Sequence, residues 1–238
     1  MALDMQSIYV LASGASRAME QLDTVTNNLA NVNTTGFKKM VIKEMSQRLD
    51  ENGGDANHLF VFPRFDQSLI DRTQGPLTHT QNPLDLAIDG DGYFVVRTQN
   101  GPLYTRDGHF FLNEQGVLVD NAGNAVMDSQ NKRVVLDPKV SFSVSEDGSI
   151  FQNGEVVAKL SIKNFDKMEP IGDTYYKPSG KETAADFRIK QGFLERSNIN
   201  AVTEMSGMIV AHRRFEIYNT LIKSLDQINQ KTNEIAKA

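Results

Sequence analysis

The sequence contains no cysteine among its 238 residues. Disulfide bonds, thiol nucleophiles and thiolate metal sites are therefore excluded, and cysteine usage leaves the cellular compartment open. No run approaches the ~18 to 20 consecutive apolar residues that a membrane-spanning helix needs, so we expect no direct membrane insertion. The first residues have no basic region and fit a cleavable secretory signal poorly. If the protein leaves the cytoplasm, we expect a route that does not read an ordinary signal peptide.

Clusters of basic residues are also absent. The net charge is −5 with a pI near 5.4, and Lys38-Lys39 and Arg213-Arg214 are pairs, not blocks. Such pairs most simply belong to solvated faces of the protein. Wrapping of nucleic acid needs a basic stripe or patch, so we expect no nucleic-acid partner.

The residue patterns of common catalytic and metal sites are missing as well. No nucleophile elbow, phosphate loop or dinucleotide fingerprint is present, and the four histidines share no metal-ligand spacing. The run Asp89-Gly90-Asp91-Gly92 has the alternate carboxylates of a calcium loop but not the later acidic ligand, so we interpret it as a hairpin turn. We expect no enzyme, cofactor, metal site or small-molecule substrate. The histidines are His58, His79, His109 and His212.

A seven-residue repeat of apolar positions is present near the start of the chain. The positions alternate in steps of three and four from Met5 to about Asn31, which predicts a helix with a stripe for another helix. Small residues on the stripe would let that helix approach closely. An asparagine-rich stretch ending at Gly36 is expected to stop the helix. The stripe consists of Met5, Ile8, Ala12, Ala15, Met19, Leu22, Thr26 and Leu29.

A second apolar stripe occupies the last part of the chain. It predicts a helix that starts near Asn198-Ile199-Asn200, where asparagine is a suitable cap. At ~1.5 Å per residue this helix exceeds about 50 Å, which is longer than a small core can cover, so the stripe implies partners. The stripe consists of Met205, Met208, Ile209, His212, Phe215, Tyr218, Leu221, Ile222, Leu225, Ile228 and Ile235, with His212 expected to pack.

The middle of the chain predicts β-structure. Short runs rich in β-branched and aromatic residues alternate with turns that contain glycine, and Asx-Gly steps supply the positive φ that tight hairpins need. The runs are Tyr93 to Thr98, His109 to Leu112, Val117 to Val119, Val134 to Leu136, Phe142 to Val144 and Val156 to Phe165. The turns are at Gly92, Gly101, Gly108, Gly116, Gly123, Gly148 and Gly154.

These patterns predict an α+β protein with a discontinuous helical domain. We expect residues 1–36 and 196–238 to form an α-helical coiled-coil core, and residues 76–195 to form an inserted antiparallel, hairpin-rich all-β domain. Residues 37–75 are interpreted as a connector with a turn at Gly53-Gly54. Its apolar stretch Leu59–Pro63 is equally compatible with a short extended segment and with a mobile loop that orders on contact.

Three segments together resemble the flagellar basal-body rod and hook family of axial proteins. Their order and spacing match over nearly the whole chain. The single β domain resembles rod subunits more than the larger hook protein, and Arg213-Arg214-Phe215-Glu216 is closer to the proximal-rod subunit than to the Gln-Arg-Ala-Tyr-Glu of distal-rod proteins. The connector differs most from the family. The segments are Asn27–Lys38, Asn82–Phe94 with Tyr104–Gly108, and Gly192–Asn200 leading to Met205 and Arg214-Phe215-Glu216.

The resemblance implies a structural subunit of the bacterial flagellar basal-body rod. Such a subunit polymerises through its terminal helices into the axial tube that transmits torque and conducts exported subunits. The implied partners are further copies and neighbouring rod, hook and ring proteins, and the implied place is the periplasm-spanning rod, reached through the flagellar secretion apparatus. The implied assembly interface comprises Met5, Ile8, Met19, Leu22 and Leu29 opposite Met205, Met208, Phe215, Ile222 and Leu225, with Asn31, Asn33 and Gly36 shaping the turn.

Other functions remain open at this point. A distal-rod or hook-type subunit is the alternative within the family. Outside it, the helices could form a closed dimeric coiled coil that displays the β domain as a binding head. A hydrolase on the β domain would need a convergent carboxylate or histidine site, which the sequence does not offer. For a rod subunit, we also predict that both termini are largely unfolded before assembly, because their apolar stripes are complete only in the tube.

Overall fold

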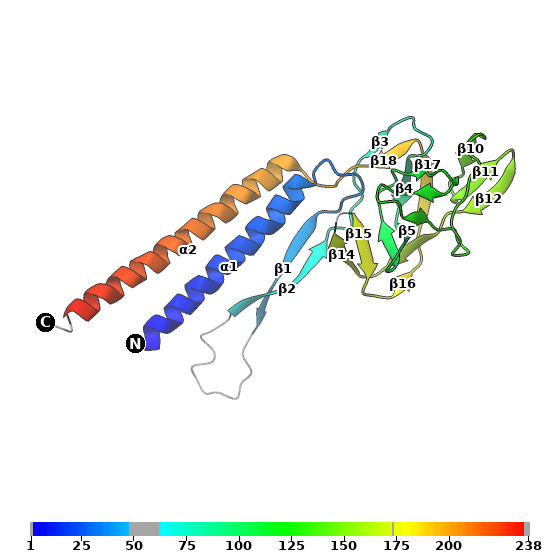
Figure 1. Cartoon of the computed structure of the whole chain (residues 1–238). Coiled ribbons are helices and arrows are strands. Elements are labelled where there is room, and N and C mark those ends of the chain that lie inside the picture. Colours follow the sequence, from blue (N-terminus) through cyan, green and yellow to red (C-terminus); the bar gives the residue numbers. More distant parts are fainter. Residues whose placement is uncertain (1, 48–61, 173, 236–238) are drawn as a thin grey trace. The chain divides into compact units, whose positions relative to one another are not determined.

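A computed structural model describes residues 2–47, 62–172 and 174–235, which divide into two compact units (Figure 1). The first unit comprises Met1–Ala30, Met40–Leu69 and Asn200–Ala238, and the second comprises Asn31–Lys39 and Ile70–Ile199. The predicted turn at Gly53-Gly54, His58 and most of the predicted segment Leu59–Pro63 lie outside the described residues.

The first unit is built on two long helices, α1 (Ala2–Ala30) and α2 (Ala201–Ile235). Asn200 caps α2 as predicted, because its Oδ1 accepts hydrogen bonds from the backbone N–H of Val202 at 3.0 Å and of Thr203 at 3.2 Å. At ~1.5 Å per residue the two helices are about 44 and 52 Å long. Neither helix, nor any other described one, is long and apolar enough to cross a membrane.

The helices pack side by side in antiparallel directions (Figure 1). Gly14 lies against the ring of Tyr218, and Gly207 lies against Val25, so the residue numbers fall along one helix as they rise along the other. The Arg214 guanidinium also donates to Gln21 Oε1 at 3.4 Å. The contact is lined by small buried residues, which permits the close approach expected from the sequence. These residues are Ala15, Ala18 and Ala211.

The packed stripe of α1 is rotated from the predicted one. Its buried and half-buried apolar positions are Ile8, Leu11, Ala15, Ala18, Leu22, Val25 and Leu29. Ala12, Met19 and Thr26 belong to the predicted stripe but are exposed, Met19 to 46%. The difference arises because two neighbouring sets of positions both satisfy a seven-residue repeat, and the helix packs on the set that contains Ala18.

A two-stranded sheet of β1 (Met40–Gln47) and β2 (Phe62–Ile70) also contributes to the first unit. The buried side chain of Asn28 joins α1 to β1: its Nδ2 donates to Met40 O at 2.9 Å and its Oδ1 accepts from Met40 N at 2.8 Å. Asn28 Nδ2 also donates to Glu204 Oε2 of α2 at 3.2 Å. One amide therefore connects three elements that are distant in sequence.

The second unit consists of short antiparallel strands. A nine-stranded sheet has the order β14-β15-β6-β5-β9-β8-β7, with β13 pairing β5 and β16; β10-β11-β12, β17-β4 and β18-β3 form smaller sheets. The strands are β3 (Leu77–His79), β4 (Leu86–Gly90), β5 (Tyr93–Thr98), β6 (Gly101–Thr105), β7 (Phe111–Leu112), β8 (Leu118–Val119), β9 (Ala125–Val126), β10 (Phe142–Val144), β11 (Ser149–Gln152), β12 (Glu155–Lys159), β13 (Ile162–Phe165), β14 (Met168–Gly172), β15 (Tyr175–Pro178), β16 (Glu182–Thr183), β17 (Phe187–Gln191) and β18 (Phe193–Glu195).

Two clusters of buried side chains fill this unit. The larger one packs aliphatic residues around Phe94 and Phe110, whose rings meet edge to face at 5.2 Å. The smaller one is rich in tyrosine, and Tyr93 and Tyr176 lie 5.4 Å apart in it. Because successive residues of β5 point to opposite faces, Tyr93 and Val95 join one cluster while Phe94 and Val96 join the other.

The β prediction is confirmed for most runs and corrected for three regions. Val134–Leu136 contributes an isolated bridge to Val117 in place of a strand, and the predicted run from Val156 is divided into β12 and β13. The Asp89–Gly92 turn does not make a hairpin, since β4 pairs with β17 and β5 pairs with β6. Residues 40–47 and 62–70 form strands β1 and β2 within the stretch interpreted as a connector.

Candidate functional site

The longest helix exposes apolar side chains on the side turned away from α1. Residues two apart on an α-helix are separated by about 200°. Val202 and Ile209 therefore stand opposite Glu204 and Ala211, which are buried. We call the exposed set the outer face of α2: Val202, Met205, Ile209, Val210, Ile217, Leu221 and Ile228, between 44% and 73% exposed.

The predicted interface residues fall into two groups. Half-buried side chains are found at Ile8, Leu22, Leu29, Met208, Phe215, Ile222 and Leu225. Met19 and Met205 are exposed, and Met205 belongs to the outer face of α2. Met5 lies in α1, but its side chain is outside the described part of the chain. Asn31, Asn33 and Gly36 lie in the turn that follows α1.

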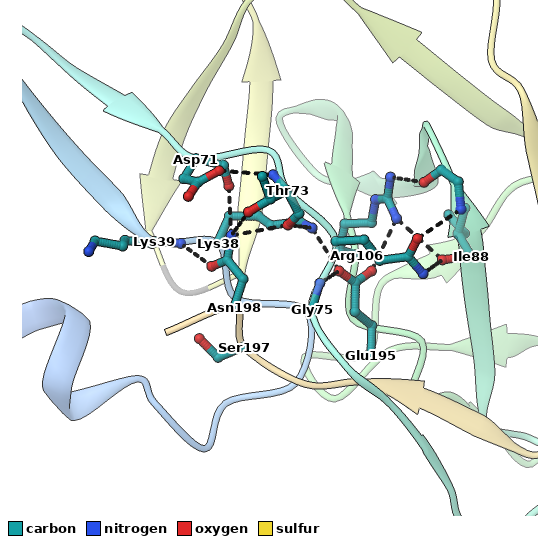
Figure 2. Close-up of polar contacts among 12 residues, drawn as sticks. Lys38, Lys39, Asp71, Thr73, Gly75, Ile88, Arg106, Glu195, Ser197 and Asn198 are labelled. Atoms are coloured by element: carbon teal, nitrogen blue, oxygen red, sulfur yellow. Dashed lines mark hydrogen bonds and ion pairs between the residues drawn. The ribbon is translucent and has the colours of Figure 1, made fainter. Parts of the chain in front are cut away.

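A buried group of three charged residues lies in the second unit (Figure 2). Glu195 Oε1 accepts hydrogen bonds from Lys38 Nζ at 2.7 Å and from the backbone N–H of Gly75 at 2.9 Å, and its Oε2 accepts from Arg106 Nη1 at 3.1 Å. The Lys38 ammonium also donates to Thr73 O at 2.8 Å. We call Lys38, Arg106 and Glu195 the charged cluster.

The charged cluster is almost completely removed from water. The side chains of Lys38 and Glu195 are 1% exposed, and that of Arg106 is 4% exposed. Burial is the main cause that lowers the pKa of Lys38, with a further lowering by Arg106, whereas Glu195 raises it. Arg106 gains a hydrogen bond to Gly90 O at 2.7 Å and lies 5.3 Å from the centre of the Tyr93 ring. Removing one member of such a group would leave an uncompensated buried charge, unless the remainder is neutral.

Backbone and amide contacts surround the charged cluster. Gly36 N donates to Glu195 O at 2.8 Å, Lys38 N donates to the Tyr176 hydroxyl at 3.0 Å, and Lys39 N donates to Asn198 Oδ1 at 2.8 Å. The Asn198 amide in turn donates to Asp71 O and Thr73 O, each at 3.0 Å (Figure 2).

The turn at 31–36 is fixed by the same unit. Asn31 Oδ1 accepts from the Thr34 hydroxyl at 3.0 Å, and Asn33 Oδ1 accepts from the Arg196 guanidinium at 3.0 Å. The Thr35 hydroxyl donates to Asp107 Oδ1 at 2.8 Å. Gly36 has a φ of +67°, a region that favours glycine.

The three segments that gave the family resemblance meet at the charged cluster. Lys38 closes the first segment, Arg106 belongs to the second, and Glu195 belongs to the third. The sequence prediction selected Leu29, Asn31, Asn33 and Gly36 from the first segment but no member of the charged cluster. It also placed the pair Lys38-Lys39 on a solvated face, which is wrong for Lys38, because that side chain is 1% exposed. Each member of the charged cluster is a charged residue within one of the three segments that carry the family resemblance. That position was the signal in the sequence that could have identified them.

Histidines and carboxylates do not form a metal centre in the part of the chain that the structure describes. His109 Nδ1 lies 2.6 Å from Asp85 Oδ1, and His212 is exposed with Glu216 at 3.8 Å, which corrects its expected packing role. A pocket of about 270 Å³ is present in the second unit. One of its carboxylates, Asp120, already accepts from the Tyr175 hydroxyl at 2.7 Å. The pocket is lined by Thr34, Thr105, Asp107, Asp120, Asn121, Ala122, Thr174 and Tyr175.

Comparison with known proteins decides the family. A FlgF flagellar basal-body rod protein of Mesorhizobium japonicum is 34% identical over 220 residues, which cover 88% of this chain and 89% of that protein. The chain belongs to the flagellar basal-body rod protein family. This confirms the resemblance that the three segments indicated.

Further relatives and family profiles agree with this assignment. A FlgF protein of Caulobacter vibrioides is 32% identical, with 96% of both chains covered. A FlgG basal-body rod protein of Bacillus subtilis is also 32% identical, with 95% of this chain and 97% of that protein covered. Three profiles match: "Flagella basal body rod protein" over residues 8–38, "Flagellar hook protein FlgE/F/G D1 domain" over 87–152, and "Flagellar basal body rod FlgEFG protein C-terminal" over 190–235.

Proposed function

We propose that this protein is a structural subunit of the flagellar basal-body rod, located in the basal body and reached through the flagellar export apparatus. The chain is similar over nearly its whole length to proteins that are named basal-body rod proteins. This similarity supports a structural role and not an enzymatic one. Within the family we propose the proximal-rod type, favoured by Arg213-Arg214-Phe215-Glu216 and by the FlgF relatives.

The observation that best supports assembly is the outer face of α2. Its packed side is occupied by α1, so a second apolar side requires a second neighbour. Covering seven half-exposed apolar side chains contributes on the order of 5–10 kcal/mol before the cost of association. We propose that the two helices form the coiled-coil core of the rod, and that copies of the chain and neighbouring rod, hook and ring proteins cover the outer face.

An open assembly also needs contacts that do not close after two copies. If the outer face bound head to tail in the next subunit, the contact would propagate as a helical tube. In that tube, residues 37–75 act as the connector and the β-rich unit faces outward. We keep Met5, Ile8, Leu22, Leu29, Met208, Phe215, Ile222 and Leu225 in the proposed interface as residues of the helix pair, and Met19 and Met205 as contacts to a neighbour.

The test is a charge on the outer face in a motile strain. Ile209→Asp should abolish swimming and the external filament, because the aspartate must be buried unpaired in the assembled rod. The monomer should fold normally, because Ile209 is 51% exposed in it. The matched control is Gln230→Asp, which adds the same charge at an exposed polar position of α2. Normal swimming of the Ile209→Asp strain, or equal loss in both strains, would contradict the assignment.

A closed coiled-coil dimer is the competing function from a different class. The two functions differ in how mass depends on concentration in analytical ultracentrifugation of the purified chain. A binding module should remain a dimer as concentration rises, whereas a rod subunit should be a monomer or form open-ended oligomers.

A further inference from the structure

We propose that the charged cluster is a latch that keeps segments 31–39 and 195–199 together in the free subunit, even when α1 and α2 are not helical. The segments are the chain immediately after α1 and immediately before α2. The proposal concerns the subunit before assembly and goes beyond its role in the rod.

The latch contains no residue of α1 or α2. Both segments belong to the second unit, and every contact that joins them lies within that unit. Gly36 N donates to Glu195 O at 2.8 Å, Lys39 N donates to Asn198 Oδ1 at 2.8 Å, and Arg196 bonds Asn33 at 3.0 Å. Unfolding of the helices therefore removes none of these hydrogen bonds.

The latch is held by a buried ion pair and a buried aromatic ring. The Lys38 ammonium and the Glu195 carboxylate are 2.7 Å apart and 1% exposed, so water competes little with their attraction. Phe37, between the turn and Lys38, is also buried, at 5% exposure. Releasing the segment would expose this ring and require water to reach the carboxylate. Both effects oppose release without any help from the helices.

The latch also keeps α1 close to α2. With segment 31–39 held, α1 ends at Ala30, directly before the held segment, so almost no free chain separates α1 from the second unit. Without the latch, the tether would extend to Ile70, roughly 40 residues from α1. Effective concentration falls as tether length increases, so the latch raises the effective concentration of α1 near α2.

Lys38→Met weakens the latch without leaving any other member of the charged cluster unpaired. Glu195 would keep Arg106 and the Gly75 N–H as partners, and Thr73 O would keep the Asn198 amide. The remaining Arg106–Glu195 pair is neutral, so no uncompensated charge is buried. The matched control is Lys159→Met, which removes the exposed Lys159–Asp147 pair of the same unit.

The experiment is residue-resolved amide exchange on the purified full-length monomer. We expect the amides of Gly36, Lys38 and Lys39 to be protected about a hundredfold more than those of α1 and α2. Lys38→Met should reduce protection at these three amides about tenfold and leave Phe94 and Val96 of β5 unchanged, while Lys159→Met should change none of them.

Three outcomes would overturn the proposal. The first is equal protection of the three amides and of the helix amides, with both losing protection together in Lys38→Met as one cooperative unit. The second is unchanged protection in Lys38→Met, and the third is loss of protection in β5 as well, which would make the cluster part of the domain core. Swimming of the Ile209→Asp strain tests the rod assignment separately, so either proposal can fail without the other.

Discussion

Replacing Gly36 by alanine should release segment 31–39 from the second unit. Gly36 has a φ of +67°, and a Cβ added there would lie 2.2 Å from Asp107 N and 2.4 Å from Arg106 C. Both neighbours are backbone atoms, so no change of rotamer can relieve the overlap. The segment itself must move, and its contacts with Glu195 and Tyr176 are lost with it.

The expected cost has two parts that a control can separate. A positive φ costs alanine about 1–2 kcal/mol. Displacement of the segment adds the loss of buried Phe37, about 1.5–3 kcal/mol, and of the Gly36–Glu195 backbone hydrogen bond, about 1 kcal/mol. Gly36→Ala should therefore lower the free energy of unfolding of the second unit by about 3.5–6 kcal/mol, and by no more than the free energy that docks the segment. Gly123 has a φ of +81° and nothing within 4 Å of an added Cβ, so Gly123→Ala should cost only about 1–2 kcal/mol.

Urea unfolding of the full chain, followed by circular dichroism at a β-sheet wavelength, measures both variants. Amide exchange at Lys39 then shows whether the segment has been released in Gly36→Ala. Equal destabilisation by the two substitutions would refute the reasoning, because the overlap with Asp107 would then have no energetic effect. A destabilised Gly36→Ala protein with Lys39 still protected would refute the release of the segment.

Two further predictions concern pH and covalent linkage. The pKa of Asp71 lies below its usual 3.8, mainly because its carboxylate accepts a hydrogen bond from the backbone N–H of Thr73. The ionised carboxylate therefore stabilises the folded protein above about pH 4, and this stabilisation is lost as the pH falls through the lowered pKa. Asp71→Asn should therefore flatten the loss of stability below pH 4 in acid unfolding, and a slope identical to that of the unmodified chain would contradict this. Gly207 lies so close to Val25 that an added Cβ would be 3.8 Å from Val25 Cγ2. With no native cysteine, the pair Val25→Cys and Gly207→Cys should therefore form an intramolecular disulfide once α1 and α2 are helical and paired. Its absence on a non-reducing gel under oxidising conditions in which circular dichroism shows both helices formed would contradict the antiparallel packing.

Local patterns were sufficient to predict the helices and most strands. The apolar repeat placed α1 from about residue 5 to 31 and α2 from about 200, close to Ala2–Ala30 and Ala201–Ile235. Steps such as Asn153-Gly154 predicted hairpins correctly, because φ is +52° and +84° there, as a tight turn requires. Each of these features is decided by residues within one or two turns of chain.

Three-dimensional choices could not be predicted in the same way. Ala12 and Met19 give the same repeat as Leu11 and Ala18, and only packing against α2 decides which pair is covered. The charged cluster joins Lys38 to Glu195 over 157 positions, a separation for which no sequence period exists. The pairing of β1 with β2 was not predicted, because the sequence was interpreted there as a connector with a turn at Gly53-Gly54 and one short extended segment.

The outer face of α2 has a consequence for how growth of a rod would end. In such a rod, the outer face of α2 remains uncovered in the copy that was added last. The tip of the rod can therefore bind a further copy, however many copies precede it. The length of the rod is then set by supply or by a different protein that covers the tip.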